Sequence, residues 1–115
     1  MTKPVGPYTP IVRAGDWLIC SGQLGLADGA IVDGGVQAQV RQAVANIKAL
    51  LESEGATLDQ VVKTTVFLAH ISDFPLVNET YAEGFGDHRP ARSTFAVSAL
   101  PLGGLVEIEA WAFTG

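Results

Sequence analysis

The sequence predicts an α+β fold: a mixed six-stranded sheet with two helices packed on one face. Apolar residues recur close to the helical period in residues 36–54, whereas runs rich in β-branched and aromatic residues occupy residues 61–69 and 105–113. Such patterns, interleaved in one short chain, are typical of a sheet covered by helices. The 115 residues, 48% of them hydrophobic, can form one core, so we expect a single domain over residues 1–115.

The N-terminal part is predicted to form a hairpin or a meander. Residues 17–23 are rich in β-forming side chains, and residues 30–32 are a shorter candidate strand. Asp28 and Gly29 form a turn signal between them. A further short strand is expected near residues 11–12, which brings the strands of the sheet to six when those after the first helix are included.

The two helices have recognisable ends. The first is predicted over residues 36–54, with Gly55 directly after it as the residue that tolerates a left-handed conformation. The second begins at Asp73, which can cap its N-terminus, and ends at Gly86. Pro75 falls in the first turn of this helix, where its missing N–H costs nothing.

The strand predicted over residues 92–98 alternates between its two faces. Arg92 and Thr94 point one way, whereas Ser93 and Phe95 point the other. The second set suits the face under the helices. We therefore expect Arg92 on the face that points away from them.

The last strand, residues 105–113, is largely apolar on both faces. Glu107, Glu109, Trp111 and Phe113 share the face that points away from the helices. A sheet face with these rings and carboxylates, in so small a chain, is most simply buried against another copy of the chain. The sequence therefore predicts an oligomer.

Composition disfavours several classes of function. A net charge of −5 and a pI near 4.7 disfavour nucleic acid as a partner. No apolar run approaches the roughly 20 residues that span a bilayer, and no leader pattern opens the chain, so we expect a cytoplasmic protein without a membrane partner. The single Cys20 is expected to be a buried hydrophobe, and His70 and His88 have no third ligand at metal spacing.

Arg92 and Glu107 are the candidate catalytic pair. Arg92 lies in the motif Pro-Ala-Arg-Ser at residues 90–93, at the start of one predicted strand, and Glu107 lies on the next. A guanidinium holds an acidic substrate, and a partly buried carboxylate can activate water. The residues alone leave a second interpretation open, in which Arg92 forms a structural ion pair, with Glu107 as one candidate partner.

Over nearly its whole length the chain resembles the Rid (YjgF) family of small enamine/imine deaminases. The resemblance rests on many short motifs in the right order, each of them weak alone. They are Gly6-Pro7-Tyr8, Ser21-Gly22-Gln23, Gln39, Asn46, Lys63-Thr64-Thr65-Val66-Phe67, Asn78, Tyr81, Pro90-Ala91-Arg92-Ser93, Leu100-Pro101 and Val106-Glu107-Ile108-Glu109-Ala110.

The resemblance implies a homotrimer of the chorismate-mutase-like type, with three sheets in a central barrel and the helices outside. Its active sites would lie in clefts between neighbouring subunits. Members with the Pro-Ala-Arg-Ser motif hydrolyse reactive enamino and imino acids, such as 2-aminoacrylate and 2-iminopropionate, to a 2-keto acid and ammonia. They use no metal or organic cofactor.

The resemblance also implies roles for particular residues. Arg92 would anchor the carboxylate of a 2-imino acid through two parallel hydrogen bonds, and Glu107 would position water and move protons. Backbone groups of Gly22 and Thr94 would help to hold the ligand carboxylate. Polar side chains expected in the same cleft, with a lower rank, are those of Tyr8, Ser21 and Asn78.

Two departures from the family pattern bear on function. Thr94 stands where better-known members usually have Cys, and the segment 85–90 is shorter than in well-studied deaminases. Arg89 in that segment could favour a more acidic substrate or point to solvent. The alternatives to a deaminase are a non-catalytic protein that binds 2-keto acids and, ranked lowest, an endoribonuclease or translation inhibitor.

Overall fold

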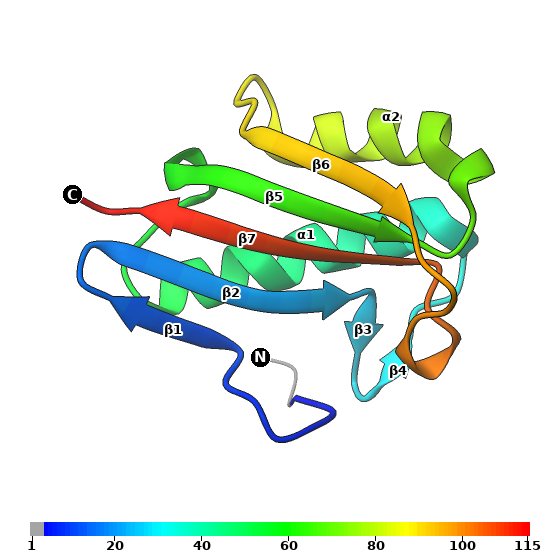
Figure 1. The fold of residues 1–115 in the computed structure, drawn as a ribbon, viewed down its shortest axis with the longest axis horizontal. Helices are drawn as coiled ribbons and strands as arrows, with labels where there is room; N and C mark the ends of the chain where they lie inside the picture. The colour runs from blue at the N-terminus through cyan, green and yellow to red at the C-terminus, as the bar shows by residue number, and fades with distance from the viewer. Residues whose placement is uncertain (1–3) are drawn as a thin grey trace.

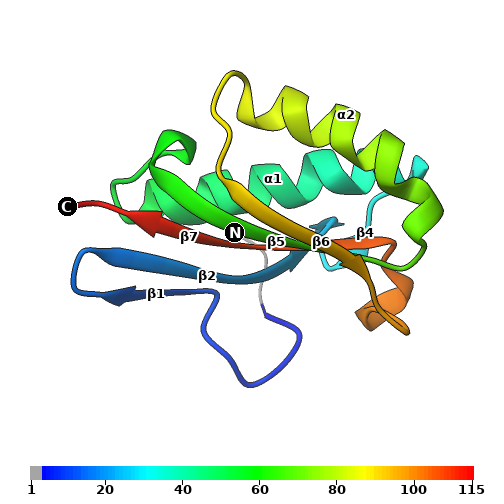
Figure 2. The same ribbon diagram turned by 45° about the horizontal axis from the view of Figure 1, so that its top comes forward.

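The protein folds as a five-stranded mixed sheet with two helices on one face (Figure 1). A computed structural model describes residues 4–115. The strands of the sheet are β1 (Ile11–Ala14), β2 (Trp17–Leu24), β5 (Val61–Leu68), β6 (Ala91–Ala96) and β7 (Val106–Phe113), and the helices are α1 (Gly35–Ser53) and α2 (Phe74–Phe85). Figure 2 shows both helices on the same side of the sheet, so the α+β prediction is confirmed.

The strand order is β1-β2-β7-β5-β6. Neighbouring strands are antiparallel except for β5 and β6, which are parallel and are joined through α2. This crossover leaves β6 at an edge of the sheet with α2 beside it (Figure 1). The connection therefore brings residues of α2 close to those of β6.

One predicted strand lies outside the main sheet. Residues Ala30–Ile31 form β4, which pairs with β3 (Leu26–Ala27) in a separate two-stranded ribbon, so the main sheet has five strands and not six. The chain leaves the sheet at Gly25, which packs so closely on α1 that a Cβ atom there would lie 2.6 Å from the Cα of Gln39. Asn46 on α1 holds this bend by donating hydrogen bonds to the carbonyl oxygens of the residues that flank Gly25.

Both helices lie close to their predicted bounds. α1 is followed by Gly55 at a φ of +76°, in the left-handed conformation expected there. α2 begins directly after Asp73 and ends before Gly86, with Pro75 in its first turn. Asp73 occupies the capping position, but its side chain makes no capping hydrogen bond, because a short 3₁₀ turn already brings its backbone to helical dihedral angles.

The core lies between the helices and the sheet. Its largest fully buried side chains include Leu18, Ile47, Leu51, Leu68 and Ile108. Cys20 is also buried there, and burial raises the pKa of its thiol to about 12. The interpretation of Cys20 as a buried hydrophobe is confirmed.

The opposite face of the sheet carries exposed aromatic side chains. Trp17 meets the edges of Trp111 and Phe113, with ring centres 6.1 and 5.0 Å apart, and Phe67 meets Phe95 at 5.3 Å. Trp111 is 41% and Phe95 47% exposed in the single chain. We refer to this surface as the open face. Exposed apolar area of this kind on a small domain marks an interaction surface.

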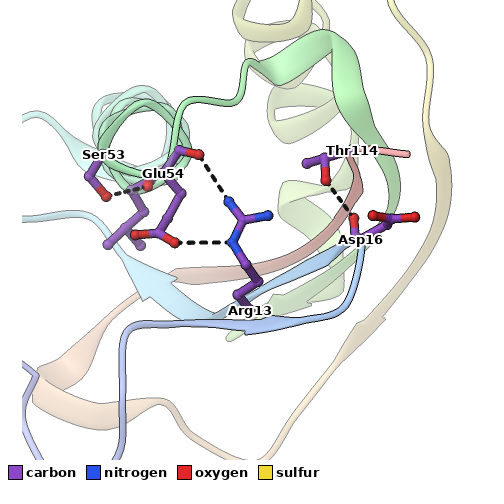
Figure 3. A network of polar contacts seen from close by, with 6 residues as sticks. Arg13, Asp16, Ser53, Glu54 and Thr114 are labelled. Carbon is purple, nitrogen blue, oxygen red and sulfur yellow. Dashed lines mark hydrogen bonds and ion pairs between the residues drawn. The ribbon is translucent and has the colours of Figure 1, made fainter.

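Polar contacts fix the β1–β2 hairpin to the rest of the fold (Figure 3). Arg13 on β1 donates to the carbonyl oxygen of Glu54 at 3.0 Å and pairs with its carboxylate at 3.5 Å. The hydroxyl of Thr114 donates to the carbonyl oxygen of Asp16 at 2.9 Å. Across residues 4–115, no helix combines the length and the hydropathy needed to cross a membrane.

Candidate active site

Four of the predicted site residues line one pocket of about 370 Å³. They are Tyr8, Ser21, Gly22 and Glu107, and we call them the pocket half-site. The remaining lining is mostly apolar, with Pro4, Val5, Pro10, Leu24, Leu26 and Pro101 beside the polar Gln23. A small concave site with apolar walls and a few polar groups is the usual form of a small-molecule site.

Ser21 and Tyr8 shape one wall of this pocket. The hydroxyl of Ser21 donates to the carbonyl oxygen of Thr9 at 2.7 Å, and its backbone N–H donates to Pro10 at 2.8 Å. The hydroxyl of Tyr8 accepts a hydrogen bond from the backbone N–H of Val5 at 3.2 Å. The two bonds of Ser21 tie the segment before β1 to β2, so Ser21 holds the wall of the pocket in place.

Gly22 makes room for the carboxylate of Glu107. A Cβ atom on Gly22 would lie 2.5 Å from Oε1 of Glu107. Cβ atoms in real proteins essentially never lie this close to another heavy atom. The strand pairing of β2 with β7 shifts register between Cys20 and Gln23, which places the glycine opposite the carboxylate. The missing side chain of Gly22 therefore serves the approach of Glu107 itself.

The pKa of Glu107 is raised above its ordinary value. Burial is the larger cause, because it disfavours the charged form, and the negative charge of Glu109 is the smaller one. Among residues 4–115, no cationic side chain lines the pocket to oppose these effects. A carboxylate with a raised pKa in a pocket is suited to exchanging protons with a ligand.

The other three predicted residues lie near α2. Arg92, Thr94 and Asn78 form what we call the arginine half-site. Nη2 of Arg92 donates to Oδ1 of Asn78 at 2.7 Å. The guanidinium also lies over two rings of α2, with its carbon 5.6 Å from the ring centre of Phe74 and 4.9 Å from that of Tyr81.

Arg92 has no acidic partner among residues 4–115. The ion pairs in that range join Arg13 to Glu54 and Arg41 to Glu83. The structural ion pair of Arg92 with Glu107 is thus absent from the single chain. The guanidinium is held by neutral groups, so its positive charge stays available to a carboxylate ligand.

Arg92 and Glu107 lie on opposite faces of the sheet, and the predicted orientation of Arg92 is wrong. Arg92 is the strand neighbour of Thr64, whose hydroxyl contacts that of Tyr81 on α2 at 2.7 Å. Glu107 pairs with Phe67, three residues further along β5 and therefore on the open face. Polarity suggested that Arg92 would avoid the helices, but α2 offers it an amide and two aromatic rings.

Thr94 carries the one buried side-chain nitrogen or oxygen atom that lacks a hydrogen-bond partner within the described part of the chain. Its hydroxyl lies on the same face of β6 as the guanidinium of Arg92, two residues away. A buried hydroxyl without a partner is costly and calls for an explanation. Among residues 4–115, the structure gives this hydroxyl no such partner.

Arg89 and His88, in the segment between α2 and β6, make hydrogen bonds to nearby backbone groups. Arg89 donates to the carbonyl oxygens of Gly86 and His88, so its guanidinium closes the turn after α2. Nε2 of His88 lies 2.7 Å from the carbonyl oxygen of Val61 at the start of β5. Residues 4–115 contain no group of three or more His, Cys, Asp or Glu side chains placed to hold a metal ion.

Comparison with known proteins shows the family of the chain. The family model described as endoribonuclease L-PSP matches residues 1–114. The chain is 45% identical over 113 residues to the 2-iminobutanoate/2-iminopropanoate deaminase of Bos taurus, covering 96% of this chain and 82% of that protein. It belongs to the Rid (YjgF) family.

Further relatives agree with this assignment. A RutC family protein of Pyrococcus horikoshii is 46% identical, covering 96% of this chain and 90% of its own length. The crystal structure of RidA from an Antarctic Psychrobacter species superposes with a TM-score of 0.92 at 39% identity, covering 96% of this chain and 91% of that one. The Rid fold is thus shared along nearly the whole chain.

Two aromatic contacts of this Rid chain escaped the sequence reasoning. Phe74 was given no role, and Tyr81 was only part of a family motif, yet both rings lie against Arg92. With Asn78 they follow a spacing of four and then three residues, which places all three on one face of α2. This spacing, in a helix that directly precedes the Pro-Ala-Arg-Ser strand, is the sequence signal that indicates the two rings.

Proposed function

We propose that the protein is a cofactor-independent deaminase that hydrolyses short 2-imino and 2-enamino acids to 2-keto acids and ammonia. The observation that carries this proposal is the guanidinium of Arg92, fixed by neutral groups and left with its charge uncompensated among residues 4–115. A planar guanidinium binds a carboxylate through two parallel hydrogen bonds. The names of relatives such as the cattle deaminase support the same substrate class.

Glu107 supplies the proton chemistry in this proposal. Its carboxylate takes a proton from water as the water oxygen attacks the imine carbon, and it delivers a proton to the imine nitrogen. The resulting carbinolamine loses ammonia as its hydroxyl oxygen becomes the carbonyl oxygen of the keto acid. One water is consumed and one ammonia released, so the step needs no oxidant, reductant or metal.

We further propose that each active site is completed between two copies in a homotrimer. The pocket half-site and the arginine half-site lie on opposite faces of one sheet, so a single chain cannot bring them to one ligand. The exposed rings of the open face support an interface between copies. One copy then supplies Arg92 and its neighbour supplies Glu107.

The remaining predicted residues have secondary roles in the proposal. Backbone groups of Gly22 and Thr94 hold the ligand carboxylate, and the free amide N–H₂ of Asn78 faces the ligand while its oxygen binds Arg92. Tyr8 and Ser21 border the pocket. The expected single domain over residues 1–115, the cytoplasmic location, and the absence of a cofactor, of a nucleic-acid partner and of a membrane partner stay predictions.

A coupled assay tests the activity. A threonine dehydratase generates the imino acid in the presence of semicarbazide, and the protein should reduce semicarbazone formation by consuming the imine first. An Arg92→Ala variant is the control. Binding of 2-oxobutanoate without turnover would favour the non-catalytic alternative, and RNA cleavage at physiological salt that disappears in Glu107→Gln would favour the endoribonuclease.

Mixing two inactive variants tests where the site is formed. Arg92→Ala and Glu107→Gln subunits, exchanged at equal amounts, should recover about one quarter of wild-type activity, because one neighbour pair in four joins an intact Arg92 to an intact Glu107. Each variant alone should stay inactive after the same treatment. No recovery, in mixtures shown by mass spectrometry to contain mixed trimers, would place both groups in one chain and contradict the proposal.

Gly22→Ala should lower kcat about 10- to 100-fold, because the added methyl group would displace the carboxylate of Glu107 from its position. Steady-state kinetics of the deamination and a thermal unfolding curve check this prediction. Gly84→Ala is the matched control, since its added Cβ would also meet a side chain, that of Val44 at 2.9 Å, but Gly84 does not line the pocket. A Gly22→Ala enzyme with wild-type kcat would show that this close approach is irrelevant to catalysis.

A further inference from the structure

One face of α2 gathers three neutral side chains around Arg92. Phe74, Asn78 and Tyr81 lie at successive turns of this helix, and each of them contacts the guanidinium. The amide oxygen of Asn78 lies 2.7 Å from Nη2. The guanidinium carbon lies 4.9 Å from the ring centre of Tyr81 and 5.6 Å from that of Phe74, both within the range of cation–π attraction.

The two rings differ in how the fold supports them. Tyr81 is buried with 4% exposure, and its hydroxyl lies 2.7 Å from that of Thr64 on β5. Phe74 is 38% exposed, so little of its ring serves the core. Replacing Tyr81 would disturb packing, whereas replacing Phe74 chiefly removes its contact with Arg92.

We propose that Phe74 and Tyr81 form an aromatic clamp that positions the Arg92 guanidinium without neutralising it, and that Phe74 is a positioning residue for the proposed reaction. A carboxylate in place of either ring would orient the guanidinium equally well, but it would compete with the substrate for the same charge. The negative face of an aromatic ring restrains the cation while leaving its N–H edge free to bind a ligand.

The kinetic effect predicted for Phe74 rests on the proposed deaminase function, whereas the contact of the rings with Arg92 does not. Phe74→Leu should raise KM for the imino acid about 3- to 10-fold with kcat within about twofold of wild type, the size expected for one partly exposed cation–π contact. Phe74→Trp should keep KM near wild type, because Trp provides the strongest ring face. Leu76→Ala is the matched control, since Leu76 is a comparably exposed apolar residue of the same helix, at 44%.

The clamp itself is tested without turnover by ¹H–¹⁵N spectra of the arginine Nε–Hε groups in the intact protein. The chain has four arginines, Arg13, Arg41, Arg89 and Arg92, and the Arg92 signal is the one lost in Arg92→Lys. It should be shifted upfield by the rings in wild type and in Phe74→Trp, and it should move toward the other three in Phe74→Leu. A merely structural role of Phe74 would not produce this signature or its restoration by Trp.

The outcomes separate the two proposals. If wild type neither deaminates nor binds 2-oxobutanoate, but the shifted signal is present and depends on Phe74, the proposed function fails and the clamp stands. If wild type is an active deaminase and Phe74→Leu leaves KM and the Arg92 signal unchanged, the clamp is wrong. A Leu76→Ala enzyme with the same rise in KM as Phe74→Leu would also overturn it.

Discussion

Glu107→Gln should nearly abolish deamination and, in an Arg92→Ala background, stabilise the folded protein at neutral pH. A glutamine cannot exchange the protons that the proposed reaction moves, so kcat should fall about 10²- to 10⁴-fold. The same change removes a carboxylate whose charged form is disfavoured by burial and by Glu109. Activity and stability should therefore change in opposite directions.

The sign of the stability effect follows from the raised pKa. Between the ordinary pKa of Glu and the raised value, the native protein binds more protons than the unfolded chain, so stability falls as pH rises through this window. In an Arg92→Ala background, the penalty is fully present above the window when residue 107 is Glu and is absent when it is Gln. The gain in melting temperature should therefore be present at neutral pH and vanish below the ordinary pKa of Glu.

Thermal unfolding across pH measures the gain in melting temperature caused by Glu107→Gln. Both proteins carry Arg92→Ala, because this change removes the guanidinium that a neighbouring copy would bring to the carboxylate. Glu109→Gln, made in the otherwise wild-type protein, is the matched control for activity. It should stay active, and the acidic limb of its kcat/KM profile should move to lower pH, because loss of the neighbouring charge lowers the pKa of Glu107. A fully active Glu107→Gln enzyme would remove the carboxylate from the mechanism.

Arg92→Lys should reduce kcat/KM at least about 100-fold although it keeps the positive charge. A lysine is a point charge that cannot offer two parallel hydrogen bonds, and it cannot keep the contact of Nη2 with Asn78 in the same geometry. Steady-state kinetics should show the loss in both KM and kcat, because the carboxylate would be held less firmly and in a poorer orientation.

The control for Arg92→Lys is Arg41→Lys, an exposed arginine on α1 whose ion pair with Glu83 at 3.9 Å can be kept by lysine. It should leave activity unchanged. Calorimetric binding of 2-oxobutanoate separates anchoring from chemistry, since Arg92→Lys should weaken binding while Arg41→Lys should not. Undiminished binding by Arg92→Lys would mean that another group holds the carboxylate.

Much of the fold could be predicted because local patterns and tertiary structure agree. The apolar period of residues 36–54 and the left-handed conformation at Gly55 give α1 to within one residue at each end. The β-branched run at residues 61–69 gives β5 to within one residue. The strand at residues 30–31 was misplaced, because its pairing with β3 depends on the close contact of Gly25 with Gln39, which no local pattern reports.

The candidate site was predictable in its members but not in its arrangement. The motifs led to Arg92 and Glu107, yet alternation along a strand gives two faces without saying which one the helices cover. The side of Arg92 is decided by the amide and the rings of α2, which lie 11 to 18 residues earlier in the chain. The use of Gly22 to admit Glu107 likewise depends on a register shift between strands distant in sequence.

Because Cys20 is buried, the proposed deamination should not depend on the redox state of the surroundings. With a pKa near 12, almost none of the thiol is thiolate at neutral pH, and the thiolate is the form that alkylating agents and most oxidants attack. The chain has no other cysteine, and a hydroxyl stands at residue 94. Iodoacetamide would then reach this thiol only when the core opens, so the rate at which the single cysteine is labelled reports the unfolding of the whole domain.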